Sequence, residues 1–192
     1  FGSLNGIAVD KAGNVYVTDG TYNTVRKITR AGVVTTLAGT PGAVGSADGT
    51  GSAAQFRFPF GIAVDSAGNL YVTDQSNQTI RKITPAGVVT TIAGAPGVIG
   101  SADGTGSGAR FSSPAGIAVD SAGNLFVADT YNYTIRKITP GGSVSTFAGT
   151  AGASGSTNGT GSSASFIFPY GVAVGGANVY VADTWNCMIR KI

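Results

Sequence analysis

Aspartate is the residue type through which this sequence could perform acid–base chemistry. All nine acidic residues are aspartates, because the chain contains no glutamate, and histidine is absent as well. Without histidine there is no Ser-His-Asp triad and no imidazole metal site. An aspartate that returns at the same place in every copy of a repeat is typical of a turn cap that accepts backbone N–H bonds. We therefore expect no catalytic residue among the repeated aspartates, which are Asp10, Asp65, Asp120, Asp19, Asp74, Asp129 and Asp183.

The remaining residues give little support to metal or redox chemistry. Cys187 is the only cysteine, so the sequence predicts no intrachain disulfide and no thiolate metal cluster. Glycine-rich runs such as G-S-A-D-G-T-G-S resemble a calcium loop, but each supplies one aspartate, Asp48 or Asp103, and Asn158 replaces it in the third run. Calcium needs about six to eight oxygen ligands. A calcium site is thus the weaker alternative, and we expect ordered loops without metal or cofactor.

These residues belong to an internal repeat. The segment Gly-Ile-Ala-Val-Asp at Gly6 returns at Gly61 and at Gly116, and as Gly-Val-Ala-Val-Gly at Gly171, each time 55 residues later. A fixed period of this order indicates a stacked or circular array rather than an ordinary globular domain. We expect positions that are identical in every copy to serve the scaffold, and positions that differ to be free for function.

Each repeat contains four segments with the residue pattern of β-strands. In the second copy they span residues 61–65, 70–74, 79–84 and 88–93, with turns between them. Four short antiparallel strands per repeat predict an all-β fold in which each repeat is one blade of a β-propeller. A β-solenoid is the competing repeat fold, but its coils are usually shorter and lack three successive hairpin turns.

The repeated motif also resembles a known family. The run G-I-A-V-D-x-A-G-N-x-Y-V-x-D, followed by N-x-T-I-R-K-I-T-P, is similar to the NHL-repeat β-propellers, and the resemblance covers the chain in four copies. It implies a propeller fold. The family includes protein-, RNA- and carbohydrate-binding modules, sensor domains of receptor kinases and a few enzymes, so the resemblance names no function. A lyase-type member relies on metal-binding histidines, which this chain lacks.

We expect residues 1–192 to form a single β-propeller domain or part of a larger ring. Four blades can close a ring, many family members have six, and two chains could form a ring of eight. Long glycine-rich loops join the blades, and each is expected to be pinned by one phenylalanine: Phe56, Phe111 or Phe166. The expected blades are approximately 1–39, 56–94, 111–149 and 166–192, joined by loops 40–55, 95–110 and 150–165.

The fourth blade is expected to lack its outer strand. Its third strand would then present unpaired backbone groups, which favour strand addition. Flanking sequence or another subunit could cover this edge. The edge strand comprises Met188, Ile189, Arg190, Lys191 and Ile192.

The loops between the second and third strands are the expected ligand-binding face. Their sequences differ between copies while the flanking strands do not. Aromatic rings beside amides suit sugar stacking or a protein hot spot, although the rings could instead pack against the neighbouring long loops. The candidate binding residues are Tyr22, Asn23, Tyr131, Asn132, Tyr133, Trp185 and Asn186.

Composition narrows the functional classes. The net charge is +3, and eight of the twelve cations form a repeated Arg-Lys pair, which favours a scaffold role over a nucleic-acid partner. No apolar run approaches the about 20 residues that cross a bilayer. Few lysines, no glutamate and many Thr, Ser and Gly suggest an extracellular or cell-surface protein. We expect a non-enzymatic module that binds a protein or glycan through its loop face. The alternative is a structural subunit of a surface or filamentous assembly, self-associating through loops and the open blade edge.

Overall fold

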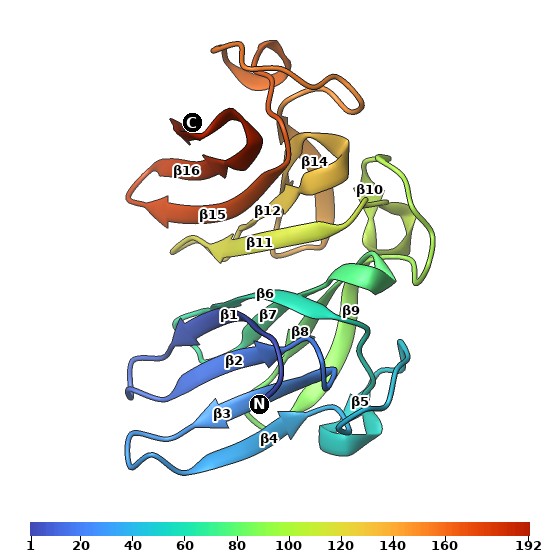
Figure 1. Cartoon of the computed structure of the whole chain (residues 1–192), viewed down its shortest axis with the longest axis vertical. Coiled ribbons are helices and arrows are strands. Elements are labelled where there is room, and N and C mark those ends of the chain that lie inside the picture. The colour runs from blue at the N-terminus through green and yellow to red at the C-terminus, as the bar shows by residue number, and fades with distance from the viewer.

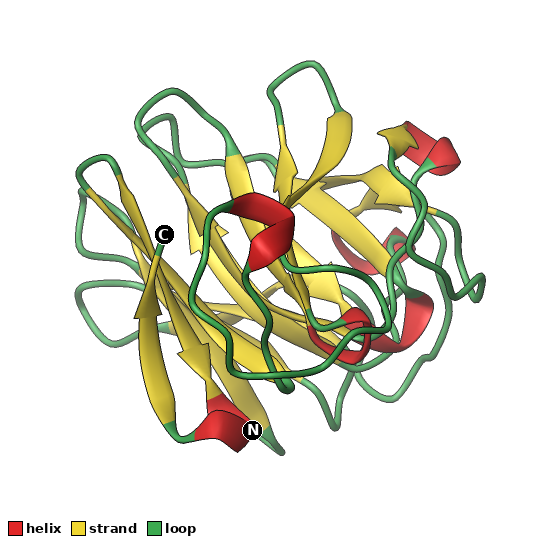
Figure 2. Cartoon of the chain, turned by 90° about the horizontal axis from the view of Figure 1, so that it is seen from above, coloured by secondary structure: helices red, strands yellow, loops and turns green.

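The computed structural model describes all residues, 1–192, and shows four antiparallel sheets, one for each repeat. The blades follow one another in chain order, and blade 1 (blue) and blade 4 (red) lie at opposite ends of the molecule in Figure 1. Only single-turn helical segments interrupt the strands and loops (Figure 2). None of the helices has the length and apolar character that a membrane span would require. The predicted β-propeller fold is confirmed.

Each blade is a meander of antiparallel strands with the innermost strand first. Blade 4 has three strands, so the predicted absence of its outer strand is confirmed. The strands are β1 (Leu4–Val9), β2 (Val15–Asp19), β3 (Thr24–Ile28) and β4 (Val34–Ala38) in blade 1; β6 (Pro59–Val64), β7 (Leu70–Asp74), β8 (Thr79–Ile83) and β9 (Val88–Gly94) in blade 2; β11 (Pro114–Val119), β12 (Leu125–Asp129), β13 (Thr134–Ile138) and β14 (Ser143–Ala148) in blade 3; and β15 (Pro169–Gly175), β16 (Asn178–Asp183) and β17 (Met188–Lys191) in blade 4.

Blades 2 and 3 contain a fifth strand that the sequence analysis missed. The glycine-rich loops fold back, and β5 (Gly49–Thr50) and β10 (Gly104–Thr105) pair with the outer strands β9 and β14. Short 3-10 turns follow in these loops, namely η1 (Gly51–Ala53), η3 (Gly106–Gly108) and η5 (Gly161–Ser163). The loops therefore belong to the sheets of the blades that they precede.

The hydrophobic core consists of three clusters, each between two consecutive blades. In the first, Tyr16 and Val25 of blade 1 contact Ile62 and Leu70 of blade 2. Because the sheets of blades 2 and 3 bury side chains on both faces, each of these blades depends on its neighbours for its core. The loop phenylalanines are fully buried, which confirms that they pin the loops: Phe56, Phe111 and Phe166.

The innermost strands approach each other backbone to backbone. Gly61 of β6 lies so close to the carbonyl of Ala115 in β11 that an added Cβ atom would collide with it. The Oγ1 atom of Thr73 accepts a hydrogen bond from the N–H of Gly61 at 2.7 Å and donates one to the carbonyl of Ala115 at 2.6 Å. One hydroxyl thus links two blades. The two inner strands lie so close together beside the axis that only glycine fits at position 61.

The outward faces of the first and last blades are exposed rather than packed on one another. Ile7 of β1 is 69% exposed, whereas its counterpart Ile62 is buried. Ile189 of β17 is 75% exposed, whereas its counterparts Ile80 and Ile135 are fully buried. The blade boundaries within a complete ring and the number of its blades stay predictions.

The interblade glycine gives a test of this packing. Gly61→Ala should destabilise the fold by about 1–3 kcal/mol, because the methyl group forces two inner strands apart. Gly171→Ala is the matched control, because a Cβ atom there meets only Ala182, at 3.2 Å. Urea unfolding of both variants measures the difference. Equal losses of stability would contradict the role given to the interblade contact.

Candidate functional site

The loops between the second and third strands share one backbone conformation. After the aspartate that ends the second strand, a 3-10 turn forms: η2 (Gln75–Asn77), η4 (Thr130–Asn132) or η6 (Thr184–Asn186). The next residue is left-handed in every blade, with φ of 55° at Asn23, 61° at Gln78, 59° at Tyr133 and 53° at Cys187. The backbone of these loops is fixed, while their outward side chains differ from copy to copy.

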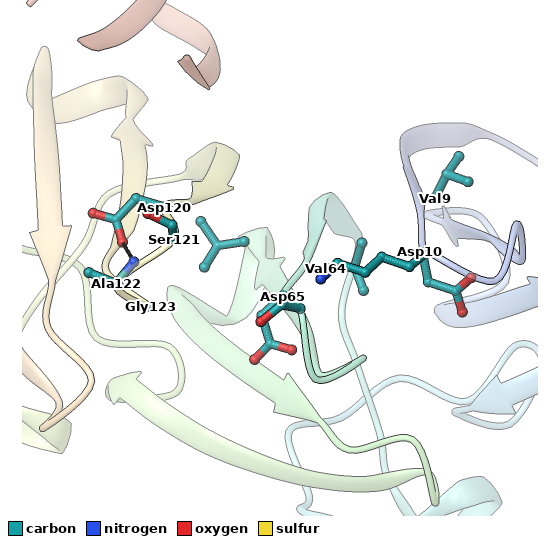
Figure 3. A pocket seen from close by; sticks show the side chains of 11 residues that line it. Val9, Asp10, Val64, Asp65, Asp120, Ser121, Ala122 and Gly123 are labelled. Carbon is teal, nitrogen blue, oxygen red and sulfur yellow. Dashed lines mark hydrogen bonds between the residues drawn. The ribbon is translucent and has the colours of Figure 1, made fainter. Parts of the chain in front are cut away.

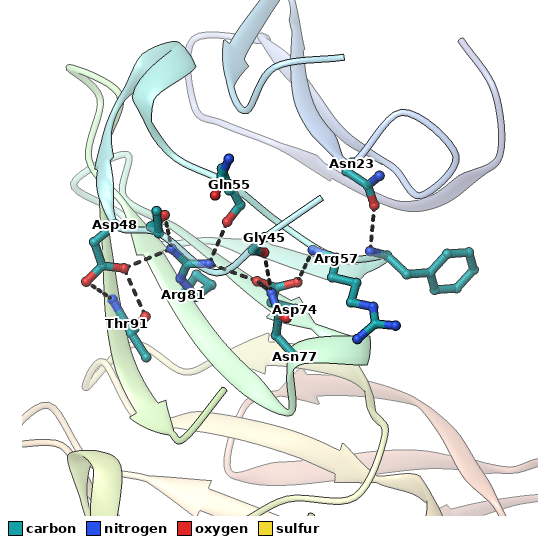
Figure 4. A network of polar contacts seen from close by, with 11 residues as sticks. Asn23, Gly45, Asp48, Gln55, Arg57, Asp74, Asn77, Arg81 and Thr91 are labelled. Atoms are coloured by element: carbon teal, nitrogen blue, oxygen red, sulfur yellow. Dashed lines mark hydrogen bonds and ion pairs between the residues drawn. The ribbon is translucent and has the colours of Figure 1, made fainter. Parts of the chain in front are cut away.

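A buried carboxylate anchors each of these loops, as Figure 4 shows for blade 2. Asp74 accepts hydrogen bonds from the N–H of Arg57, the amide of Asn77 and Nη1 of Arg81, each at 2.8 Å. Burial raises the pKa of Asp74 to about 6, against the opposing effect of these donors and of the arginine charge. This aspartate is therefore half of a buried ion pair, and the interpretation as a simple turn cap is incomplete for it.

The same arginine also holds the glycine-rich loop. Nη2 of Arg81 donates to Asp48 at 2.8 Å, and Asp48 accepts further bonds from the N–H and the hydroxyl of Thr91. Burial works against ionisation of Asp48, but the Thr91 bonds and the arginine charge hold its pKa below the usual value. Asp48 thus has two partners within the chain. Blade 3 repeats the arrangement, and blade 4 substitutes an amide, with Arg136 on Asp103 and Arg190 on Asn158.

A hollow of about 410 Å³ lies where the turns after the innermost strands of blades 1 to 3 meet (Figure 3). Asp10, Asp65 and Asp120 line it. The carboxylate of Asp65 accepts the N–H groups of Ala67 and Asn69, both at 2.9 Å. These three aspartates are turn caps, as predicted. Burial works against ionisation of Asp65 and Asp120, but hydrogen bonds from the turn hold the pKa values of all three aspartates below the usual value. The oxygens of these ionised carboxylates are engaged by the N–H groups and amides of the turns, so the structure gives them a scaffold role.

Four aromatic rings meet on the loop face where blades 3 and 4 adjoin. The ring of Phe168 lies 4.7 Å from that of Trp185, 5.2 Å from that of Tyr131 and 5.1 Å from that of Tyr133, measured between centroids. Trp185 is 68% exposed and Tyr131 is 54% exposed. Three rings therefore pack on Phe168, and two of them, Trp185 and Tyr131, face solvent. We call these four residues the aromatic cluster.

The centre of the aromatic cluster has an unusual backbone. Phe168 has φ of 47°, a left-handed conformation that costs energy for a bulky residue. At the equivalent place in blades 2 and 3, a side-chain amide of the preceding blade binds the N–H group: Asn23 binds Phe58 at 2.8 Å and Gln78 binds Ser113 at 2.6 Å. Tyr133 has no amide, and its ring contacts Phe168 instead. Aromatic contact replaces a hydrogen bond at this interblade joint.

The predicted site residues fall into two groups, aromatic residues on the surface and amides that bind within the chain. Tyr131, Tyr133 and Trp185 come together in the aromatic cluster, whereas Tyr22 lies exposed on blade 1, outside it. The predicted amides bind within the chain. Asn23 is buried against the N–H of Phe58, Asn132 donates to Gly100 and Asp129, and Asn186 donates to Gly155 and Asp183.

The sequence analysis missed Phe168, although a signal was present. The position of Phe168 is occupied by Ser3, Phe58 and Ser113 in the other copies. It therefore varies between copies, as do the candidate binding positions in the loops between the second and third strands. A second group of rings continues from Phe58 toward the axis. Phe60 lies 6.3 Å from Phe58 and 6.0 Å from Tyr170, beside an axial hollow of about 280 Å³.

Radial antiparallel blades with a variable loop face define a β-propeller. The NHL repeat model matches residues 56–83 and 111–138, so the chain contains NHL repeats. It is 42% identical over 95 residues to the chloroplastic protein SUPPRESSOR OF QUENCHING 1 of Arabidopsis thaliana, covering 49% of this chain and 9% of that protein. It is 33% identical over 153 residues to NHL repeat-containing protein 2 of Bos taurus, covering 72% of this chain and 21% of the relative. The chain thus spans a small part of these relatives.

Solved structures share the fold. A protein of unknown function from Bacteroides thetaiotaomicron superposes with a TM-score of 0.82 and 26% identity, over 99% of this chain and 47% of that one. An auxiliary nutrient binding protein from the same species gives a TM-score of 0.77 and 21% identity, over 98% and 47% of the two chains. A streptogramin B lyase superposes with a TM-score of 0.69 and 17% identity, over 98% of this chain and 51% of the lyase chain. The last two similarities concern the fold alone.

Replacement of Arg81, which binds both Asp74 and Asp48, tests whether this arginine anchors the loops. Arg81→Met should cost about 3–5 kcal/mol of stability, because the buried carboxylate of Asp74 loses its counter-charge. Arg26→Met is the matched control in blade 1, where the guanidinium lies 4.9 Å from the Phe1 ring. That change should cost less than about 1 kcal/mol. Urea unfolding measures the stability of both variants. An equal loss of stability in Arg26→Met would contradict the anchoring role of Arg81.

The carboxylate of Asp48 predicts a pH effect. Its folded pKa is lowered, so its ionised form stabilises the fold above the unfolded pKa of about 3.9, and this contribution is lost as the pH falls through the folded pKa. The difference in unfolding free energy between wild type and Asp48→Asn should therefore be constant near neutral pH and shrink below about pH 4. Urea titrations at stepped pH measure it. Asp129 lies in blade 3, away from Asp48, and titrates in both proteins, so its effect cancels. If the difference in unfolding free energy between wild type and Asp48→Asn increased below about pH 4, the prediction would be contradicted.

Proposed function

We propose that this protein is a non-enzymatic binding module that recognises a protein or glycan through the aromatic cluster. The observation that carries the proposal is that four rings share one surface while Trp185 and Tyr131 remain mostly exposed. Exposed rings gathered at one place suit the apolar face of a sugar or a protein hot spot. Scattered single apolar side chains would carry no such meaning.

Rigidity supports the same proposal. Trp185 follows the buried Asp183, which is held by Arg190 and Asn186, so the loop that presents the indole is anchored from below. The left-handed Phe168 supports both exposed rings from the centre. A pre-organised surface loses little conformational entropy when a ligand binds, and this favours affinity.

The non-enzymatic part of the proposal rests on the residue inventory. The chain lacks histidine and glutamate, and the aspartates of blade 2 are occupied by turn N–H groups, amides or arginine. Solved propellers of this fold include a nutrient-binding protein and a lyase, so the fold itself favours neither class. The composition, rich in Thr, Ser and Gly and free of glutamate, supports an extracellular or cell-surface location as part of the proposal.

Self-association is the second candidate function. The exposed faces of blades 1 and 4 are the same surfaces that blades 2 and 3 bury against their neighbours, so blade 1 of one copy is complementary in pattern to blade 4 of another. The exposed Ile7 and Ile189 favour this assembly. Light scattering over a range of concentrations discriminates, because a strict monomer at high concentration is incompatible with it.

Replacement of the exposed rings tests the binding module. Glycan arrays and a panel of purified extracellular-matrix proteins identify a ligand, and calorimetry then measures its affinity. Trp185→Ala and Tyr131→Ala should each weaken binding by about tenfold or more, since each removes a desolvated stacking surface. Ile99→Ala is the control, because Ile99 is comparably exposed on a loop outside the aromatic cluster. Unchanged affinity in both ring variants would refute the assignment of the surface.

A further inference from the structure

A hollow of about 460 Å³ lies between blades 2 and 3. Tyr71, Lys82 and Ile92 of blade 2 line one side, and the turn at residues 139–142 of blade 3 lines the other. Both blades have five strands and lie in the middle of the chain, so each has a neighbouring blade on both sides. The volume falls within the range of small-molecule sites.

The hollow leaves an aromatic ring uncovered that the neighbouring blades cover. Tyr16, the counterpart of Tyr71 in blade 1, is only 6% exposed. Phe126, the counterpart in blade 3, is 5% exposed and contacts the ring of Phe147 edge-on, with 5.1 Å between the centroids. Tyr71 is only partly buried, because Ile92 stands where blade 3 has Phe147. A space beside the Tyr71 ring is therefore left open.

The turn of blade 3 also leaves more room than the matching turn of blade 2. In blade 2, a Cβ atom added to Gly87 would lie 3.3 Å from the carbonyl oxygen of Leu37 in blade 1. In blade 3, the corresponding distance from Gly142 to blade 2 is 3.9 Å. The preceding residue is Gly141, whereas blade 2 has Ala86 there. The hollow thus arises from positions that differ between copies.

Three hydrogen-bond donors that line the hollow have no acceptor within the chain. Lys82 lies over the ring of Tyr71, 6.0 Å from its centroid, and the ion pairs of the structure involve only arginines. The hydroxyl of Thr139 accepts from the N–H of Ser143 at 3.3 Å and donates to no group. The N–H of Gly141 is also unbonded. Free donors of which one is charged favour an anionic ligand.

The acidic residue in the lining is Asp65, and its oxygens are already engaged. Oδ1 accepts from the N–H groups of Ala67 and Asn69, each at 2.9 Å. Oδ2 accepts from the amide of Asn69 at 2.9 Å and from the hydroxyl of Tyr71 at 3.1 Å. Lys82 is therefore the charge without a partner. A single cation matches a monoanion, whereas a dianion would place a second negative charge near Asp65.

We propose that this hollow binds a small carboxylate with a flat apolar body. The carboxylate group accepts from Lys82, with Thr139 and Gly141 as further donors. The apolar body covers the ring of Tyr71, as a phenylalanine ring covers the matching position in blade 3. The site goes beyond the proposed function, because it lies beside the turns that precede the second strands, whereas the aromatic cluster lies beside the loops that follow them.

Calorimetric titration of the chain with 2-naphthoate tests the proposal. Saturable binding with a Kd below about 1 mM is expected. The neutral analogue 2-naphthamide has the same shape and should bind at least about tenfold more weakly, because it forms no charge-assisted bond with the ammonium group.

A lysine variant locates the carboxylate. Lys82→Gln should weaken binding of 2-naphthoate by about tenfold, since it removes the unpaired charge. Lys27→Gln is the matched control, because Lys27 lies over Tyr16 in the same way, 5.8 Å from the ring centroid, beside a ring that is already buried. The control should bind 2-naphthoate with unchanged affinity.

Two further variants close the hollow with residues that other blades hold at the same positions. Ile92→Phe should abolish binding, because the new ring covers Tyr71 as Phe147 covers Phe126. Gly141→Ala should weaken binding by about threefold or more, since its methyl group narrows the hollow. A Cβ atom at Gly141 meets only the hydroxyl of Thr139, at 3.9 Å, so this variant should fold normally. Circular dichroism melts establish that both variants are folded.

Four results would overturn the proposal. One is the absence of saturable binding up to about 1 mM 2-naphthoate by the folded chain. The second is equal affinity for the acid and the amide. The third is unchanged affinity in both Lys82→Gln and Gly141→Ala. The fourth is loss of binding in Trp185→Ala, which would place the probe at the aromatic cluster. Normal binding by Trp185→Ala is expected and separates this site from the loop-face ligand.

Discussion

The close backbone approach of neighbouring blades at the axis is the constraint on which the rest of the structure depends. Each sheet has apolar side chains on both faces and forms its core only against another sheet. Glycine at the innermost strand lets the two backbones meet, and a threonine hydroxyl bonds to both of them in blades 1 and 2. The radial arrangement, and with it the common loop face, follows from this contact.

The scaffold and the variable surface are separated within each loop. The aspartate and the left-handed residue recur in all four blades, the arginine bound to the aspartate recurs in blades 2 to 4, and together they fix the backbone of the loop. The residues that point outward are free to differ, and blades 3 and 4 use this freedom for the rings of the aromatic cluster. The repeated part therefore determines where a ligand would lie, while the unrepeated part determines its chemistry.

The sequence predicted those features that depend on local pattern. Strand alternation located the blades, and the buried Phe56 was expected as the loop pin. The fifth strand was not predicted, because Gly49 and Thr50 have no alternation to mark a strand. The pairing of Arg81 with Asp48 joins residues far apart in the chain, and only their common period could have indicated it. Phe168 was missed because its partners come from two different blades, so the aromatic cluster exists only after the blades have packed.

The glycine-rich loops also have a consequence for biosynthesis. The Asp48 carboxylate meets Thr91, 43 residues further along the chain. During translation the loop must therefore remain unpaired until the outer strand of its own blade has left the ribosome. In blades 2 and 3 the outer strand, which is the last strand of the blade to be made, therefore completes the contact with the loop.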